Sequence, residues 1–324
     1  MPRLASLKGP SRDGVLAVVS ADHSRSLALP GVSLQGVLEQ WDLYKGEIAE
    51  LGSQLDAGAG EPLVAGDMLA ALPRAYQWCE GSTYLSHMER CRAARGADLP
   101  PGHGESPAVL QGSGDRFLSP AEPIPPGDPE WGLDLEGTVA VVVDDVPAGV
   151  GVEEAGAHVR LVLIANDLTF RNILPLEFAK GVGFFQAKPL RVLSPLAVTP
   201  EELGPAWDGR LLHATMEIAL NDEPLGSLDT GADAAFDFPE VIAYAARTRP
   251  LAAGTVVGTG TVSNRDEAKG AACLAEKRAL QLLAGEEPSP YLVPGDTIRI
   301  EALSEDGASL FGAMAASVAA RSST

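Results

Sequence analysis

The sequence predicts a mainly β fold with some helices, which is an α+β protein. Short apolar runs bounded by Gly, Pro, Asn and Asp recur along the chain, as in β-rich folds. Helical patterns are fewer, strands and helices do not alternate regularly, and the chain has no internal repeat. Its 324 residues exceed the usual size of one domain. We therefore expect a large domain accompanied by a smaller one.

Composition narrows the classes of function. Hydrophobic residues make up 45% of the chain, while 24 basic residues face 44 acidic ones, a formal net charge of −20. This balance opposes binding to nucleic acid or to anionic membranes through a basic surface. The three cysteines lie far apart and form no C-x-x-C pair, so the sequence suggests neither a disulfide framework nor a zinc cluster. The N-terminus lacks the apolar core of a signal peptide, and no apolar run reaches the ~18 residues of a membrane span. We expect a soluble, cytoplasmic protein with reduced thiols.

Residues 1–75 are predicted to form a small β-rich unit. Strands are expected over 3–7 and 15–20, joined by the Gly- and Pro-rich turn at 9–14. A helix is expected to begin at Val32-Ser33 and to end in the loop at 56–60. No residue here is of a type that suggests chemistry, so we interpret the unit as a cap that supports the rest.

The next helix carries the first candidate functional residue. Ser82 is predicted to cap a helix that runs from Thr83 to Arg95 and closes at Gly96. His87 lies beside its apolar stripe, either as a hydrogen-bonded packing residue or as a base whose ordinary pKa is near neutrality. The Pro- and Gly-rich stretch 97–132, with a short strand at 108–111, is predicted to be a long functional loop.

The stretch LDLEGTVAVVV, at 133–143, is predicted to be a strand with acidic groups on one face. Asp134, Glu136 and Thr138 share that face, because side chains alternate along a strand. Buried carboxylates require a cation, a hydrogen-bond network or a proton. The alternative is a structural strand whose first half emerges into water.

The remaining elements follow from the same signals. A helix is expected over 153–160, and a strand over 161–165 that ends at Asn166-Asp167. The segment 167–188 mixes charge and glycine in a way that core strands do not. We further expect a hairpin after residue 214 with Asn221-Asp222 at its turn. Helices are then predicted over 237–246 and 273–283, and strands over 256–262, 297–302 and 309–312.

Five segments, taken together and in order, resemble the fumarylacetoacetate hydrolase superfamily and its bacterial fumarylacetoacetase-like branch. They are PRAYQWCEGSTYLSHMERCRAARG (73–96), EWGLDLEGTVAVVVDDVP (130–147), IANDLTFRNILPLEFAKGVGFFQAKP (164–189), GTGTVSN (258–264) and PGDTIRIEALSEDGASLFG (294–312). The resemblance implies a rolled mixed β-sheet or β-sandwich catalytic domain at 76–318, a small SH3-like domain at 1–75, and a flexible tail at 319–324. It also implies a homodimer that acts on small anionic keto acids, most often with Mg²⁺, Mn²⁺ or Ca²⁺.

The resemblance also implies roles for individual residues. A hard dication prefers carboxylate oxygens and can chelate and polarise a β-diketo acid. His87 would deprotonate the attacking water, and a glutamate matched near Glu276 would pair with it. Arg171 and Lys188 would hold substrate oxygens or stabilise an oxyanion. The implied metal ligands are Glu80, Glu136 and Asp167, with Thr138 at a fourth position, and the implied substrate contacts are Ser82, Arg171, Lys188 and Thr261.

Two departures from the family pattern leave alternatives open. Thr138 replaces a second glutamate, and Glu80 stands where aspartate is common, so the metal could be bound weakly or lost. The first hypothesis is metal-assisted cleavage of a C–C bond by hydrolysis or decarboxylation. The others are metal-free tautomerisation or cyclisation, and a non-catalytic ligand-binding protein. Without the family pattern, Arg171 and Lys188 could be a surface charge pair. Residues 258–261 could likewise be only a tight turn at the end of a strand. The glycines there lack a full G-x-G-x-x-G, which opposes dinucleotide binding.

Overall fold

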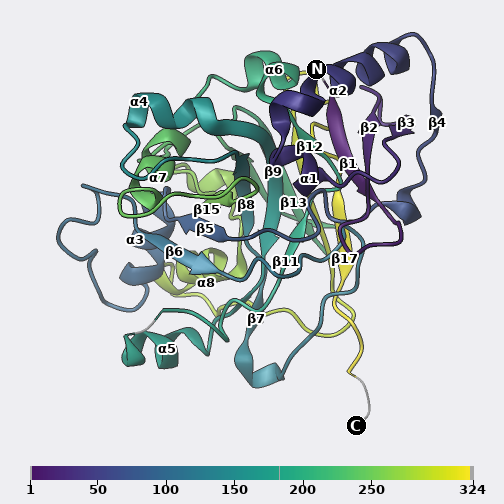
Figure 1. Cartoon of the computed structure of the whole chain (residues 1–324). Coiled ribbons are helices and arrows are strands. Elements are labelled where there is room, and N and C mark those ends of the chain that lie inside the picture. Colours follow the sequence, from purple (N-terminus) through teal and green to yellow (C-terminus); the bar gives the residue numbers. More distant parts are fainter. Residues whose placement is uncertain (1, 182, 322–324) are drawn as a thin grey trace.

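A large, strongly curved sheet forms the framework of the protein (Figure 1). The computed structural model describes residues 2–181 and 183–321. In this sheet the strands run in the order β4-β3-β2-β1-β12-β9-β8-β15-β5-β6, with β11 also paired to β9. Neighbours are antiparallel except β15 and β5. The strands are β1 (Arg3–Leu7), β2 (Val15–Val19), β3 (Arg25–Ala28), β4 (Glu61–Pro62), β5 (Trp78–Gly81), β6 (Val109–Gly112), β8 (Gly137–Val143), β9 (Val159–Asp167), β11 (Arg191–Leu193), β12 (Ala197–Val198) and β15 (Val256–Thr261).

Two smaller sheets accompany the large one. A four-stranded antiparallel sheet has the order β14-β13-β16-β17, and β7 (Leu133–Asp134) pairs with β10 (Thr169–Phe170). The first contains β13 (Thr215–Leu220), β14 (Glu223–Asp229), β16 (Thr297–Leu303) and β17 (Met314–Ser317). The predicted hairpin turn is confirmed, since Asn221 and Asp222 both have positive φ, as a tight two-residue turn requires.

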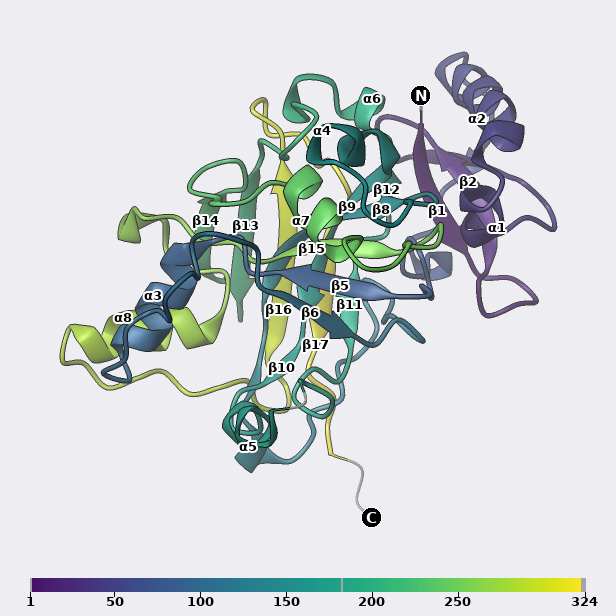
Figure 2. The same ribbon diagram turned by 60° about the vertical axis from the view of Figure 1, so that its left-hand side comes forward.

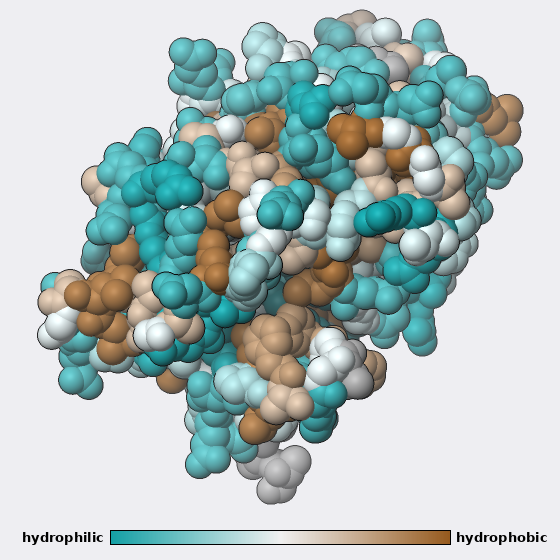
Figure 3. All heavy atoms as spheres, turned by 90° about the vertical axis from the view of Figure 1, so that its left-hand side faces the viewer, coloured by the Kyte–Doolittle hydropathy of each residue, from teal (hydrophilic) through white to brown (hydrophobic). Residues whose placement is uncertain are grey.

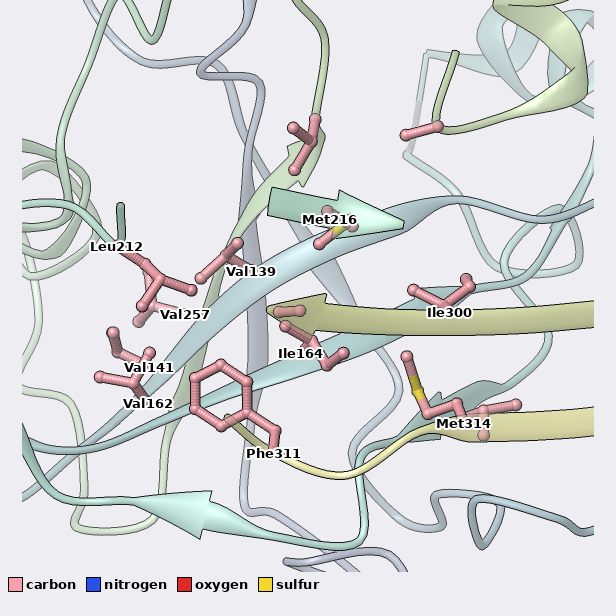
Figure 4. Close-up of a cluster of buried hydrophobic side chains, with 14 of the residues drawn as sticks. Val139, Val141, Val162, Ile164, Leu212, Met216, Val257, Ile300, Phe311 and Met314 are labelled. Atoms are coloured by element: carbon pink, nitrogen blue, oxygen red, sulfur yellow. The ribbon is translucent and has the colours of Figure 1, made fainter. Parts of the chain in front are cut away.

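Strand β8 is buried on both faces, which explains its continuous apolar sequence. Val139 and Val141 belong to a core that also contains Met216 and Ile300 of the four-stranded sheet (Figure 4). Ala140 and Val142 face the other way, into a second core shared with the N-terminal strands and helices. Alternate side chains of one strand therefore join two cores.

Helices lie around the sheets on several sides (Figure 2). Helices α1 and α2 lie beside the N-terminal strands, whereas α3 and α8 pack against each other at the opposite end. The α-helices are α1 (Leu34–Leu38), α2 (Trp41–Asp56), α3 (Leu85–Ala93), α4 (Val152–Ala155), α5 (Leu174–Lys180), α6 (Pro200–Leu203), α7 (Phe238–Ala245) and α8 (Leu274–Leu283). Short 3₁₀ turns occur at Ala65–Asp67, Pro129–Trp131, Gly156–His158, Gly204–Ala206 and Glu267–Lys269.

The fold class predicted from the sequence is confirmed, with several local corrections. The helix expected from Val32 to residue 56 is two helices, broken between Leu38 and Trp41. The helix expected over 153–160 ends early, because β9 already begins at Val159. The strand expected over 309–312 lies instead at β17, and part of the predicted tail, 322–324, lies outside the described residues. Within the described ranges, no helix is long and apolar enough to cross a membrane.

Candidate active site

Three carboxylates converge at one end of the central strands. Glu80 comes from β5, Asp167 ends β9, and Glu136 lies between β7 and β8. Their oxygens lie within 4.8 Å of one another, and all three side chains are buried. The backbone N–H of Glu136 donates to the side-chain oxygen of Asn166, and the N–H of Asp167 donates to the backbone carbonyl of Glu136. These two bonds hold the strand ends together. Residues that lie 31 to 87 positions apart in sequence therefore form one acidic group.

The ammonium group of Lys188 lies between these carboxylates. Its Nζ is 2.7 Å from Glu136 Oε2, 2.6 Å from Asp167 Oδ2 and 3.8 Å from Glu80 Oε2. Burial lowers the pKa of Lys188, but the carboxylates outweigh burial and raise it above its usual value. Lys188 is therefore a fixed positive charge at the centre of the acidic group.

A carboxylate on α5 places Lys188 there. Glu177 accepts hydrogen bonds from the backbone N–H groups of Phe185, Gln186 and Ala187. The carbonyl of Ala187 in turn accepts from the N–H of Phe170. These bonds fold the chain back against α5 immediately before Lys188. The sequence offered no periodic signal for this helix, because it is short and begins at a proline-containing turn.

Arg171 joins Glu136 to the start of α8. Its guanidinium pairs with Glu136 and, at 2.7 Å, with Asp134. Asp134 also accepts the N–H groups of Leu274 and Ala275, the first residues of α8. Asp134 is therefore not part of the three-carboxylate group, because its oxygens hold a helix N-terminus, where unpaired N–H groups favour a negative charge.

Charge in this region is balanced by a third cation that the sequence analysis missed. Arg191, fully buried on β11, lies 2.8 Å from Asp167 and stacks over the ring of Trp78. Burial, followed by the charge of Asp167, raises the pKa of Glu80 well above its usual range. Burial also raises the pKa of Asp167, but Arg191 and Lys188 outweigh it, so the pKa of Asp167 lies below its usual range. With Glu80 protonated, the three cations Arg171, Lys188 and Arg191 lie opposite the carboxylates of Asp134, Glu136 and Asp167.

Helices α3 and α8 form a second cluster around His87. Its Nδ1 lies 2.9 Å from Glu276 Oε2, while Arg90 and Ser263 hold Glu276 Oε1 at 2.6 and 2.7 Å. Burial lowers the pKa of His87, but Cys91 and Cys273 raise it, and the result lies well above the usual value. This direction is opposite to the one that burial alone would give. The predicted pairing partner Glu276 does lie against His87.

Ser82 and Thr261 lie beside the acidic group without side-chain contacts to it. Ser82 follows β5 but does not cap α3, whose N-cap is Tyr84. The predicted cap is wrong because Ser82 instead continues the β5–β6 pairing through its N–H. Thr261 pairs with Thr138 across a register shift in β15. Gly260 permits this shift, since its φ is +79° and a Cβ there would lie 2.3 Å from the carbonyl oxygen of Gly81.

The donor set fits a hard divalent cation. Carboxylate oxygens are the ligands that Mg²⁺ and Mn²⁺ prefer, and three of them already converge in a buried position. Thr138 Oγ1 is also buried and has no hydrogen-bond partner among the described residues. An ion held by Glu80, Glu136 and Asp167 would have to displace the Lys188 ammonium and the Glu80 proton.

Two alternatives from the sequence are wrong. Arg171 and Lys188 are not a surface pair, because their side chains are only 12% and 8% exposed. The start of the acidic strand does not emerge into water, because Asp134 and Glu136 are buried. The strand is interrupted at Leu135 and Glu136, where the chain bridges to Cys273 instead.

Comparisons with known proteins show which family the chain matches. Residues 77–319 match the family described as fumarylacetoacetate (FAA) hydrolase C-terminal, and residues 2–74 match fumarylacetoacetase N-terminal domain 2. The oxaloacetate tautomerase YisK of Bacillus subtilis (strain 168) is 28% identical over 186 residues, 57% of this chain. The aligned part of the chain spans only 58% of that protein's length.

Solved structures share the whole architecture. The fumarylacetoacetate hydrolase of the psychrophile Exiguobacterium antarcticum has a TM-score of 0.69 and 22% identity, covering 99% of this chain and 100% of that one. The maleylpyruvate hydrolase of Sphingobium sp. SYK-6, solved with manganese(II) and pyruvate, has a TM-score of 0.65 and 18% identity, covering 98% of both chains. At such identities the likeness shows a common fold. Because the family match spans well over half of the sequence, this chain belongs to the fumarylacetoacetate hydrolase family.

Proposed function

We propose that this protein hydrolyses a carbon–carbon bond of a small β-keto or β-diketo acid, with His87 as the general base. The observation that carries the proposal is the buried His87–Glu276 pair. Arg171 lies within electrostatic reach of the cysteines beside that pair and also contacts Glu136. His87, which could accept a proton from water, therefore lies close to the group of carboxylates and cations around Glu136.

The roles of the residues follow from their charges. His87 removes a proton from water, and Glu276 stabilises the imidazolium that results. The oxygen of that water attacks the substrate carbonyl carbon, the C–C bond breaks, and its electron pair passes to the departing enolate. Arg171 and Lys188, whose side chains are largely buried, offer positive charge to the developing oxyanion. A divalent cation held by Glu80, Glu136 and Asp167 would polarise the same carbonyl.

The test is turnover of acylpyruvates and oxaloacetate, followed by product analysis. We expect His87→Ala to lower turnover by roughly 10²-fold or more, because the water loses its base. His213→Ala is the matched control, since His213 also pairs with a carboxylate, Asp208, but on the surface. Wild-type turnover should rise with pH through the raised pKa of His87. Equal turnover in the two variants would remove His87 from the mechanism.

Metal dependence is tested separately on chelator-stripped protein. Calorimetric titration with Mg²⁺ and Mn²⁺ should show weak binding in the wild type and tighter binding in Thr138→Glu, which adds a fourth carboxylate. Thr138→Val removes the unpartnered hydroxyl, a further oxygen donor, and should bind more weakly than the wild type. Full activity in chelator would contradict the role of the ion.

A second candidate function is metal-free tautomerisation of a keto acid. It is favoured by the position of Lys188, whose ammonium already supplies positive charge between the carboxylates. It is also in keeping with the oxaloacetate tautomerase to which part of the chain is similar. Interconversion of enol and keto oxaloacetate in chelator, without cleavage products, would favour this function over hydrolysis. Binding of these acids without any conversion would instead indicate a ligand-binding protein.

A further inference from the structure

Two cysteines that the proposed hydrolysis does not use flank His87. Cys91 lies one helical turn after it on α3, and Cys273 immediately precedes α8. Their Sγ atoms lie 3.9 Å and 3.8 Å from His87 Nδ1, which also faces Glu276 Oε2 at 2.9 Å. One imidazole nitrogen, two sulfurs and one carboxylate oxygen therefore converge from two helices.

These separations approach those of a tetrahedral zinc site. Zn–S and Zn–N bonds of about 2.3 and 2.0 Å at tetrahedral angles place nitrogen and sulfur ligands roughly 3.6 Å apart. The ligand atoms of His87, Cys273 and Glu276 lie within 4.8 Å of one another, and Cys91 adds a second sulfur beside the same nitrogen. Coordination by all four residues requires the Cys91 side chain to turn from His87 toward Cys273 and Glu276, because only its distance to His87 is this short.

The surroundings of the cluster also suit a bound cation. Arg90 and Ser263 hold Oε1 of Glu276, which leaves Oε2 directed at His87, as outer groups orient the ligands of metal sites. Glu276 and Cys273 are fully buried, whereas the His87 side chain is 16% exposed, so an ion has a route from the His87 side. Arg90 and Arg171 offset the charge of the thiolates that binding would create.

We propose that His87, Cys91, Cys273 and Glu276 form a binding site for a thiophilic divalent cation, Zn²⁺ in the first instance, distinct from the all-oxygen carboxylate group. Thiolate and imidazole ligands select Zn²⁺ over Mg²⁺. When the ion is bound, Nδ1 of His87 coordinates it and no longer shares a hydrogen bond with Glu276 Oε2. Given the proposed function, such an ion inhibits the enzyme reversibly by separating the base from its partner.

The binding test uses Co²⁺ as a spectroscopic probe on reduced, chelator-stripped, full-length protein in excess Mg²⁺. We expect a cobalt–thiolate charge-transfer band that Zn²⁺ abolishes by competition. The band should vanish in Cys91→Ser/Cys273→Ser and persist in the control Cys79→Ala, whose thiol lies in β5. Serine is a favoured N-cap, so Cys273→Ser should preserve the start of α8. The absence of the band from wild type, or its survival in the double variant, would overturn the site.

Two further measurements do not depend on the variants or on turnover. Zn²⁺ should slow alkylation of Cys91, which is partly exposed, in the wild type, and should shift the ¹⁵N signal of His87 Nδ1. An unchanged His87 signal would overturn coordination of the ion by Nδ1. Inhibition of turnover by Zn²⁺ should be lost in the double cysteine variant, and equal inhibition of both proteins would overturn the inhibitory role. A protein that shows the cobalt band but turns over no keto acid would refute the proposed function and leave the metal site standing.

Discussion

Lys188 is the residue on which the charge of the acidic group depends. Its ammonium contacts Glu136 and Asp167 where water is excluded, so no solvent can replace it. Removing one partner of a buried ion pair leaves the other charge uncompensated, which commonly costs about 3–5 kcal/mol. A divalent cation bound by the same oxygens could supply the missing charge.

We therefore predict that Lys188→Met lowers the melting temperature strongly in chelator and that Mn²⁺ restores much of it. Thermal unfolding followed by fluorescence with and without Mn²⁺ measures both effects. Lys45→Met is the control, because Lys45 pairs with Asp42 on the surface and its loss should change nothing measurable. A Lys188 variant as stable as the wild type in chelator would show that its ammonium does not hold the carboxylates together.

The His87–Glu276 pair makes stability depend on pH. Burial raises the pKa of Glu276, but its contacts with His87, Ser263 and Arg90 lower it by more. The pKa of Glu276 is therefore lower in the folded state than in the unfolded state. Its contribution is present above the unfolded pKa of about 4.3 and is lost as pH falls through the folded pKa. His87, whose pKa is raised, contributes below about pH 6.5, and that part is lost as pH rises through its folded pKa.

The stability difference between wild type and Glu276→Gln should therefore be largest from about pH 5 to 6.5 and should shrink toward both extremes. Urea unfolding of the two proteins across this range, in chelator, measures the difference. Glu39→Gln is a suitable control, because Glu39 bonds to Gln35 and Tyr76 near the surface rather than to histidine. A difference that does not vary with pH would indicate that the pair does not titrate as described.

At the scale of elements, the interrupted strand β7–β8 and the helix α8 are built as one unit. The strand breaks after Asp134, so that Asp134 can receive the N–H groups at the start of α8 while Glu136 turns toward the acidic group. Gly137 then resumes the strand by donating to the carbonyl of Ala272. Glu276 lies in the first turn of the helix that this unit fixes.

Asp134→Asn should therefore affect both stability and turnover. The amide oxygen can still accept one helix N–H, but Arg171 loses a buried partner, and we expect a loss of roughly 3 kcal/mol. Turnover should fall as well, because α8 holds Glu276 against His87. Chemical unfolding and the keto-acid assay measure the two effects. The control is Asp144→Asn, whose partners His158 and Arg160 lie partly exposed, and which should cost less than about 1 kcal/mol.

At the scale of the whole molecule, the N-terminal region shares its sheet and its core with the catalytic region. Strand β1 pairs with β12, which continues the large sheet without a gap. Leu4 and Val18 pack in the same core as Val142 and Leu163 of the central strands. Hydrophobic burial is lost on both sides when such an interface is opened.

Deletion of residues 1–74 should therefore prevent cooperative folding of the remainder, because it uncovers an apolar sheet face and the edge of β12. Near-ultraviolet circular dichroism, thermal unfolding and gel filtration report on this. Deletion of residues 322–324 serves as the control truncation. A monomeric remainder with a cooperative melt would show that the catalytic region folds independently.

Many parts of the fold could be predicted because they depend on local patterns, whereas the roles of the site residues were implied by the resemblance to the family. The two-residue turn at Asn221-Asp222 and the apolar strands needed only their own residues. Helix α5 and the break in the acidic strand could not be predicted, since distant partners create them: Glu177 binds the backbone of 185–187, and Asp134 binds the start of α8. Arg191 gave no signal because a lone arginine in an apolar segment does not reveal its partner, Asp167.

The sequence by itself determined that the chain is mainly β with helices and which family it resembles. Apolar periodicity and the order of motifs can be recognised from neighbouring residues in the sequence, and they do not depend on the details of packing. Only the tertiary structure decided where charges and ligands meet. It placed the Lys188 ammonium between three carboxylates, and it brought Cys91 and Cys273 to the same histidine although they are far apart in sequence. Electrostatic and coordination contacts act over a few ångströms in space, so the separation of residues along the chain does not reveal them.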